Sequence, residues 1–513
     1  MPPFKISRRD CLKLAGAVGA AATSAGSARR IAATKESAIL NIGSRRELFV
    51  DTFLIERLEN AALRLHHPIP REVSLKHDAP WEGSGCGYHT VFRDGDRFRM
   101  YYTANHLPVE SDESIAKHPI FAAYAESTDG IHWDKPDLGL FEFGGSTRNN
   151  IVWAGRSAHD FTPFLDTNPE CRPDEKYKAV AVGDGGLVAF KSTDGIHWIR
   201  LVEGPMITRG AFDTQNLAFW DTVQGQYRAY IRDFHNGIRD IRTSVSDDFR
   251  TWSQPEILQF PGSPDEQLYT NQVLPYLRAP HILLGFPTRY VERDWSQSMR
   301  DLPDRAHREL RSAQSQRFGT AITDGLFMSS RDGRTFHRWG EAFIRPGIER
   351  PDNWVYGDGY QNWGIIETES DVPGAPTELS VYSLENSWKV SCQLRRFTLR
   401  TDGFVSVNAP LSGGEFVTRP LRFDGDRLEM NFSTSAAGSV RVEIQEPDGT
   451  PVEGYALDDC PDIFGDSLAR TVRWTSGSDL GRFSGKPVRL RFVLNDADLY
   501  AIQFHHQSNQ ATS

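Results

Sequence analysis

The chain has 513 residues, of which 25% are charged and 11% aromatic, and its formal net charge is −10. Its length allows two or three domains and a large buried core. An acidic chain without a basic stripe is poorly suited to bind nucleic acid or an anionic membrane surface, so both are excluded as main partners. The sequence indicates no oligomeric state.

The N-terminal residues resemble a bacterial export signal. Ser7-Arg8-Arg9-Asp10 precedes the apolar run 12–22, which is followed by small residues. Paired arginines before a weakly hydrophobic segment are typical of the twin-arginine signal. A membrane anchor is the alternative, but the run is too short to cross a bilayer. We therefore expect residues 1–30 to be a signal peptide, cleaved near Ala28, and the protein to be periplasmic or secreted.

Four cysteines follow this segment, at Cys86, Cys171, Cys392 and Cys460. They are scattered and contain no C-x-x-C pair, so no zinc site is expected. An oxidising compartment permits disulfides, but the spacing does not decide a pairing. Buried free thiols are the expectation.

A seven-residue motif occurs twice without change, at residues 127–133 and 192–198, and looser copies occur at 246–252 and 330–336. A recurring Ser-x-Asp-Gly turn followed by an aromatic residue is typical of repeated β-units. Asp caps such a turn, Gly takes the positive φ, and the aromatic side chain packs between units. We therefore expect the aspartates of these turns to be structural and not catalytic.

Between residues 88 and 407 the sequence consists of short β-runs separated by turns rich in Gly, Asp and Asn, and the runs group in fours. Five such groups in series predict an all-β fold, a five-bladed β-propeller over residues 45–410. The first strands of the five groups are predicted to start at Tyr88, Phe161, Asn216, Asn271 and Tyr360.

The remaining segments are assigned around this repeat. The run 47–55 is expected to supply a strand that closes the ring, and 404–407 to be the last strand of the fifth group. The polar insertion 291–317 is expected to be partly helical. After Pro410, alternating apolar runs and tight turns predict a C-terminal β-sandwich over residues 411–513.

One face of such a propeller carries the starts of the first strands and the loops between second and third strands, whereas the repeated turns lie on the opposite face. Polar side chains with catalytic chemistry gather on the first face, where a ring of blades would direct them into one axial funnel. The candidates are Glu82, His89, Asp160, Asp213, Arg232, Glu266, Tyr269, Arg289, Asp358 and Glu385.

Glycoside cleavage uses two carboxyl groups: one protonates the leaving oxygen, and the other activates water or attacks the anomeric carbon. Carboxylates that share a funnel raise one another's pKa, which favours a protonated donor beside an ionised partner. The insertions 105–119 and 291–317 would wall off the funnel, so an exo-acting glycoside hydrolase is expected. The aromatic residues expected to stack on sugar rings are Trp81, Tyr269, Trp354 and Tyr360.

Residues 47–407 resemble the five-bladed propeller glycosidases, which include the family 43 arabinosidases and xylosidases, the family 32 fructosidases and predicted hydrolases of planctomycete-type bacteria. The resemblance rests on Leu48-Phe49-Val50-Asp51, on the repeated Ser-Thr-Asp-Gly-Ile-His-Trp turns and on Asp213-Thr214-Gln215-Asn216. The C-terminal region also looks like the sandwich that follows the propeller in family 32.

The resemblance implies three carboxylates from successive blades. Asp160 would be the base or nucleophile, Asp213 a central residue that tunes a pKa or binds the transition state, and Glu266 the acid, with Asp358 and Glu385 in reserve. The series departs from the family pattern by one blade, because the first blade starts with His, and the family 32 run Trp-x-Asn-Asp-Pro is absent. No cofactor is predicted; a structural Ca²⁺ is compatible with the relatives, but no run of ligands indicates one.

Two other functions stay open at the level of sequence. A glycan-binding propeller without catalysis would bind sugar and release no product. A glycoside phosphorylase would need a basic phosphate pocket, for which Arg232 and Arg289 are candidates. A sialidase is less favoured, because no clear arginine triad is visible. The sequence names neither the sugar, the linkage nor the stereochemical outcome.

Overall fold

The computed structural model describes residues 39–107, 109, 117–389 and 392–506. The export signal predicted for residues 1–30 therefore lies outside the described residues. No helix in the described part of the chain is long and apolar enough to span a membrane. The fold is mostly β, as expected for an all-β protein.

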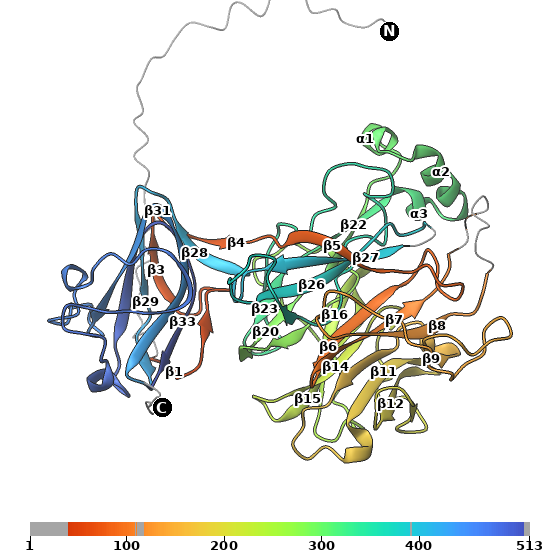
Figure 1. Cartoon of the computed structure of the whole chain (residues 1–513), viewed down its shortest axis with the longest axis horizontal. Helices are drawn as coiled ribbons and strands as arrows, with labels where there is room; N and C mark the ends of the chain where they lie inside the picture. Colours follow the sequence, from red (N-terminus) through yellow and green to blue (C-terminus); the bar gives the residue numbers. More distant parts are fainter. Residues whose placement is uncertain (1–38, 108, 110–116, 390–391, 507–513) are drawn as a thin grey trace, which may run out of the picture. The chain divides into compact units, whose positions relative to one another are not determined.

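Five antiparallel four-stranded sheets are built from the described residues (Figure 1). Sheet one contains β6 (Gly87–Asp94), β7 (Arg97–Ala104), β8 (Phe121–Ser127) and β9 (Ile151–Ala154). Sheet two contains β10 (Thr162–Leu165), β11 (Tyr177–Gly183), β12 (Gly186–Ser192) and β13 (Ile199–Arg200). Sheet three contains β14 (Leu217–Asp221), β15 (Gln226–His235), β16 (Ile238–Ser246) and β17 (Glu256–Ile257).

The last two sheets depart from simple chain order. Sheet four contains β19 (Leu274–Tyr276), β20 (Ala279–Gly285), β23 (Met328–Ser330) and β24 (Phe336–Arg338). Sheet five contains β25 (Ile366–Thr368), β26 (Glu378–Glu385), β27 (Gln393–Leu399) and β5 (Ile69–Lys76). A three-stranded sheet of β18 (Gln267–Leu268), β21 (Thr288–Glu292) and β22 (Ala321–Gly325) flanks the insertion. Five four-stranded sheets agree with the predicted grouping of strands in fours, but the fourth strand of sheet five is not the one predicted.

The insertion is partly helical, as predicted. It contains α1 (Gln297–Asp301), α2 (Arg305–Gln314) and α3 (Gln316–Thr320), which lie beside one another in Figure 1. Ser296 caps α1 by accepting a hydrogen bond from the Met299 backbone N–H at 3.2 Å. Four 3₁₀ turns also occur in the described residues, at Arg156–Ala158, Pro173–Glu175, Leu457–Asp459 and Gly481–Phe483.

The strand that completes sheet five is a different one from the strand expected. β5 pairs with β27, with Lys76 opposite Gln393, whereas Glu47–Leu48 (β2) pairs with β33 (Arg489–His505). The prediction that 47–55 closes the ring and that 404–407 ends the fifth group is therefore wrong. Pro70 within β5 argues against a strand in sequence, but β5 lies at a sheet edge, where a missing N–H is tolerated.

The repeated turns join neighbouring sheets. The Tyr101 hydroxyl of sheet one donates to the Gly195 carbonyl of sheet two at 2.8 Å. Tyr230 of sheet three does the same to Gly333 of sheet four at 2.8 Å. Tyr382 of sheet five donates to the Gly130 carbonyl of sheet one, so the last sheet contacts the first.

Inside each turn the Asp side chain holds the backbone. One oxygen of Asp129 accepts from the Ile131 and His132 N–H groups at 2.7 and 2.8 Å, and Asp194 repeats both bonds at 2.8 Å. Partial burial opposes ionisation of Asp129, but these bonds and the His132 side chain lower its pKa below the ordinary range. The structural role predicted for the turn aspartates is thus supported by their contacts.

The C-terminal strands form an eight-stranded sheet with a separate apolar core. It contains β28 (Val405–Ala409), β29 (Gly414–Thr418), β31 (Arg427–Gln445), β32 (Asp466–Thr471) and β33, together with β2, β3 (Ile55–Glu59) and β4 (Ala62–Leu65). β1 (Leu40–Gly43) and β30 (Leu421–Phe423) form a separate parallel pair, whose Ile42, Leu421 and Phe423 belong to the same core. Segments 55–65 and 405–409 fall in the range predicted for the propeller, but they pair with C-terminal strands. The alternation of their apolar residues matches these partners, which are distant in sequence.

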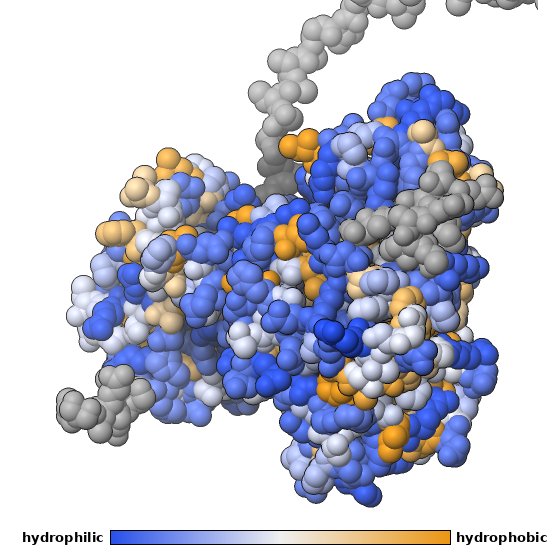
Figure 2. Space-filling view, turned by 45° about the vertical axis from the view of Figure 1, so that its right-hand side comes forward, coloured by the Kyte–Doolittle hydropathy of each residue, from blue (hydrophilic) through white to orange (hydrophobic). Residues whose placement is uncertain are grey.

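On the face shown in Figure 2, hydrophilic residues predominate and apolar residues are scattered. This surface fits the acidic, polar composition.

Candidate functional site

The strand starts and loops around sheets one, two and five enclose a cavity of about 180 Å³, which we call the aromatic pocket. Part of its wall is formed by small residues, namely Gly85, Gly87, Gly357 and Ser387. Its aromatic lining residues are Tyr88, His159, Tyr269, Phe318, Tyr356, Tyr360 and Trp388. Phe318 comes from α3, so the insertion contributes one wall, as expected from the sequence.

Several of these rings pack against one another. Phe318 and Trp388 lie 4.8 Å apart between centroids, and Tyr269 and Tyr360 lie 5.5 Å apart. Aromatic residues offer a flat apolar face and, in Tyr and Trp, a polar edge. A sugar ring, with C–H groups on its face and hydroxyls on its rim, matches that surface.

Two of these residues have left-handed backbone conformations. The φ of Tyr88 is 53° and that of Trp388 is 74°. Such conformations cost a bulky residue roughly 1–3 kcal/mol each and cluster at functional sites. The fold therefore accepts local strain to direct two aromatic side chains of this pocket.

The pocket tyrosines keep their protons. Burial raises the pKa of Tyr88 and of Tyr360 well above the ordinary value, and Tyr356 shifts in the same direction. Their hydroxyls therefore serve as hydrogen-bond donors near neutral pH and not as phenolate nucleophiles.

Asp358 lies directly behind the pocket wall. It follows Gly357, and one of its oxygens accepts a hydrogen bond from the Ser387 backbone N–H at 2.9 Å. Burial raises the pKa of Asp358 to about 7, against the Ser387 bonds, and the charge of Glu385 raises it further. A carboxyl group in this state is half protonated near neutral pH, as a general acid requires.

Asp213 is the exposed carboxylate of this region. Its side chain is 81% exposed and lies 3.5 Å from an Arg232 guanidinium nitrogen. Its charge reaches two lining residues, Tyr88 and His159. Burial nevertheless lowers the pKa of His159, so that ring is neutral at pH 7. Asp213 therefore borders the aromatic pocket from the sheet-three side.

Asp160 does not line the aromatic pocket. It is fully buried and accepts from the Val182 N–H at 3.0 Å. Asn216 accepts in the same way from the Arg232 N–H at 3.2 Å, and Asn362 from the Tyr382 N–H at 2.7 Å.

Each of these three bonds ties the start of a sheet to its second strand. Asp160 thus takes the place that asparagine has in sheets three and five, and burial raises its pKa to about 7. The role of base or nucleophile expected for Asp160 is therefore not supported by its position.

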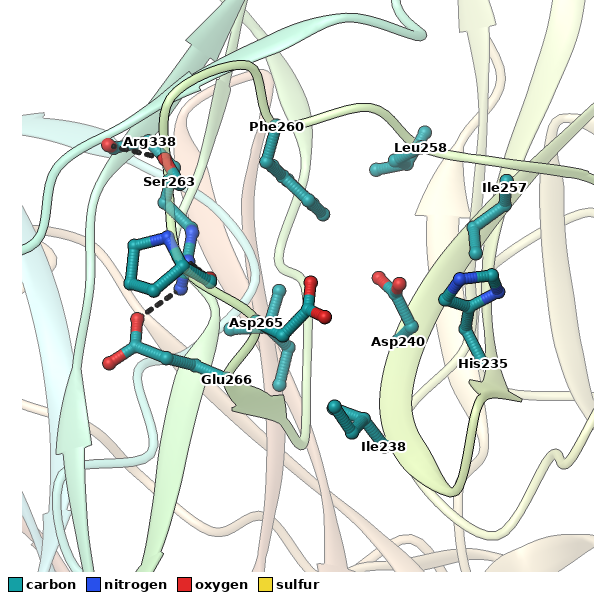
Figure 3. Close-up of a pocket in the computed structure, with 12 residues that line it drawn as sticks. His235, Ile238, Asp240, Ile257, Leu258, Phe260, Ser263, Asp265, Glu266 and Arg338 are labelled. Atoms are coloured by element: carbon teal, nitrogen blue, oxygen red, sulfur yellow. Dashed lines mark hydrogen bonds and ion pairs between the residues drawn. The ribbon is translucent and has the colours of Figure 1, made fainter.

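Glu266 lies in a different cavity, also of about 180 Å³, which we call the Glu266 cavity (Figure 3). Its carboxylate forms ion pairs with Arg289 at 3.0 Å and with Arg338. Asp240 and Asp265 direct their carboxylates into the same space in Figure 3. This cavity shares no lining residue with the aromatic pocket. Glu266 therefore lies apart from the aromatic pocket. Asp160 and Asp213 still interact, since burial and then the charge of Asp213 raise the pKa of Asp160. The convergence of all three carboxylates in one funnel is not seen.

The remaining predicted site residues also lie at different places, and only some are at the aromatic pocket. Tyr269 lines the aromatic pocket, and Arg232 lies against its ring. Arg289, the other arginine considered for a phosphate pocket, is held by Asp324 at 2.7 Å as well as by Glu266. Glu385 pairs with Arg395 at 2.9 Å.

Glu82 and His89 belong to a buried polar network behind sheet one. Glu82 accepts from Lys135 at 2.7 Å and from Tyr102; although burial alone raises its pKa, His77 and Lys135 lower it to about 2. His89 lies 3.1 Å from His77, and burial lowers its pKa well below the ordinary value. Neither lines the aromatic pocket.

Sequence reasoning missed most of the aromatic wall. Tyr88, Phe318, Tyr356 and Trp388 were not among the candidates, whereas Trp81 and Trp354, which were, donate to Asn150 and to the Gly347 carbonyl and do not line the pocket. Tyr88 was detectable as the first residue of the first predicted strand.

The cysteines that the structure describes are free thiols, and three of them, Cys86, Cys392 and Cys460, are buried. Within the described residues no group of three or more His, Cys, Asp or Glu side chains is placed to hold a metal ion.

No protein-family model and no curated protein matches the sequence. Among solved structures, the chain is similar to an N-acetylgalactosamine deacetylase from F. plautii (13% identity, TM-score 0.39, 66% of this chain and 96% of that chain covered). It is also similar to a GH32 β-fructofuranosidase from Bombyx mori (10% identity, TM-score 0.36, 87% and 95% covered). A third is the catalytic domain of a GH62 α-L-arabinofuranosidase from Coprinopsis cinerea (10% identity, TM-score 0.38, 67% and 97% covered). These distant likenesses assign no activity to the chain.

Proposed function

We propose that the chain is an exo-acting glycoside hydrolase whose aromatic pocket holds the terminal sugar of its substrate. The five four-stranded sheets would be the blades of a propeller, followed by a C-terminal sandwich. The contacts from sheet one to two, three to four and five to one support a closed ring. The arginine pair Arg8-Arg9 supports export to the periplasm or the medium.

The observation that carries the proposal is the Asp358 carboxyl. It has a pKa of about 7 and lies one residue behind the pocket wall. An acid poised near neutral pH, beside an aromatic sugar platform, is suited to protonate a glycosidic oxygen.

The partner would be Asp213, the exposed carboxylate whose charge reaches two residues that line the pocket. In that role it would activate water or attack the anomeric carbon once Asp358 donates its proton. Arg232, which pairs with Asp213 and touches Tyr269, would orient it. The pocket tyrosines would donate hydrogen bonds to sugar hydroxyls.

The test is a screen of the purified protein against plant and algal oligosaccharides with product detection, followed by the variants Asp213→Asn and Asp358→Asn. Asp332→Asn, in a repeated turn, is the matched control. Loss of product in the first two variants with normal turnover in the third supports the assignment. Full activity in Asp358→Asn contradicts it.

A second candidate is a glycan-binding protein without catalysis. It is favoured by one observation: of the three carboxylates first expected to react, Asp160 is buried and Glu266 is held by two arginines. This function predicts sugar binding with no product after long incubation. Product release that depends on added phosphate would instead indicate a phosphorylase.

A further inference from the structure

Three guanidinium groups lie over aromatic rings that line the aromatic pocket. Arg232 lies 5.3 Å and Arg239 5.5 Å from the centroid of Tyr269. Arg317 lies 5.8 Å from the centroid of Tyr356. Both rings line the pocket. The arginines come from β15, β16 and the insertion, so three separate elements bring positive charge to one place.

Two of these arginines lack an anionic partner in the described part of the chain. Arg239 donates to the Gln267 side-chain oxygen at 3.0 Å, and its buried Nε has no acceptor. No described carboxylate lies within ion-pairing distance of Arg239 or Arg317. In the Glu266 cavity, by contrast, Arg289 and Arg338 both have carboxylate partners.

Of the carboxylates nearby, Asp213 pairs with Arg232, and Glu292 accepts the Tyr290 hydroxyl at 2.9 Å. Arg239 and Arg317 therefore keep positive charge that no described carboxylate pairs with. A planar guanidinium recognises carboxylate or sulfate groups through paired N–H bonds, and partial burial strengthens them.

We propose that the sugar bound in the aromatic pocket is anionic, carrying a carboxylate or a sulfate ester that Arg239 and Arg317 bind. This inference rests on the proposed function, because it takes the aromatic pocket as the sugar site. The rings would hold the face of the sugar while the two arginines hold its charged substituent.

The experiment compares calorimetric affinities of the full-length protein for methyl β-D-glucuronide, its uncharged methyl ester, methyl β-D-glucoside and galactose 6-sulfate. We expect at least one anionic probe to bind about tenfold or more tightly than the neutral ones, as charge-assisted bonds predict. The preference should weaken as salt is added. Equal or tighter binding of the neutral probes overturns the inference while leaving the proposed function intact.

Variants locate the charge recognition. Arg239→Gln and Arg317→Gln should each remove most of the preference for the anionic probe, whereas Arg239→Lys should restore part of it. Arg334→Gln is the control, because that arginine pairs with Glu256 at 2.6 Å in a repeated turn. Retention of the full preference in both glutamine variants overturns the inference. If none of the probes binds, the proposed function fails, and this inference fails with it.

Discussion

The aromatic pocket and the Glu266 cavity have the same volume, about 180 Å³, and each has carboxyl groups beside it. The two cavities differ in the partners that these carboxyl groups have. Glu266 is bound by two guanidinium groups, whereas Asp358 is buried and accepts from Ser387. The first arrangement fixes a carboxylate in an ion-pair network, and the second leaves a proton ready to be transferred. If Asp358 is the proton donor proposed above, position on a strand start does not by itself make a carboxyl group catalytic.

The largest expected effect is a difference in kcat between variants of the aromatic pocket and variants of the Glu266 cavity. Asp358→Asn removes the proton donor and should lower kcat roughly 10²- to 10⁴-fold. Glu266→Gln should leave kcat within a few-fold, since Glu266 lies outside the aromatic pocket. Initial rates on the best oligosaccharide from the screen measure both. A larger loss in Glu266→Gln than in Asp358→Asn would reverse the assignment of the active site.

The same difference predicts a pH dependence. Since Asp358 must be protonated to act and its pKa is about 7, kcat should fall about tenfold per pH unit above pH 7.

The raised pKa of Asp358 also predicts how the stability of the protein changes with pH. Its pKa is raised on folding, so its contribution to stability is full below the unfolded pKa and is lost as pH rises toward 7. Wild type should therefore lose stability relative to Asp358→Asn between about pH 4 and 7. Denaturant unfolding across this range checks the sign; a relative gain in wild-type stability would contradict it.

The Glu266 cavity should be important for stability instead. Glu266→Gln leaves the guanidinium of Arg338, whose side chain is 2% exposed, without its carboxylate. Breaking a buried ion pair in this way costs about 3 kcal/mol. Denaturant unfolding of the variant measures the loss, and Glu341→Gln, in the loop after β24, is a control. Unchanged stability would mean that this network is weak.

Matched aromatic truncations sharpen the comparison at the level of binding. Phe318→Ala removes one wall of the aromatic pocket and should weaken sugar binding roughly tenfold, as loss of a stacking ring does. Phe260→Ala makes the same change in the Glu266 cavity and should leave sugar affinity unaltered. Calorimetry with one oligosaccharide compares them directly. Equal losses would show that the aromatic pocket is not the only sugar site.

The smallest effect concerns the turns. Asp332→Ala removes the bonds to the Arg334 and Thr335 N–H groups, at 2.8 and 2.7 Å, and should cost about 1 kcal/mol of stability without changing activity. Thermal unfolding and initial rates together test this. A loss of turnover would give these turns a role beyond structure.

The strand pattern was predictable because its signals are local. The Ser-x-Asp-Gly turns satisfy their own backbone within three residues, so the grouping of strands in fours is visible without tertiary information. The strand closing sheet five was not predictable, because β5 lies more than 300 residues from β27 and contains a proline.

The site was less predictable, because the state of a carboxyl group depends on distant partners. Glu266 is held by arginines 23 and 72 residues away. Asp160 is buried where it accepts a backbone hydrogen bond of the kind that asparagine accepts in other sheets. Sequence alone placed Asp213, Tyr269 and Asp358 near the pocket, but it did not separate them from the ion-paired candidates. The aromatic wall comes from six separate segments, which only the fold brings together.

The most direct test is a crystal structure of the Asp358→Asn variant with a bound oligosaccharide. The sugar ring at the chain end should lie against Tyr356 and Trp388, with its glycosidic oxygen facing residue 358 and Asp213 on the other side. A sugar seated in the Glu266 cavity, or on the face of the repeated turns, would contradict the proposed site.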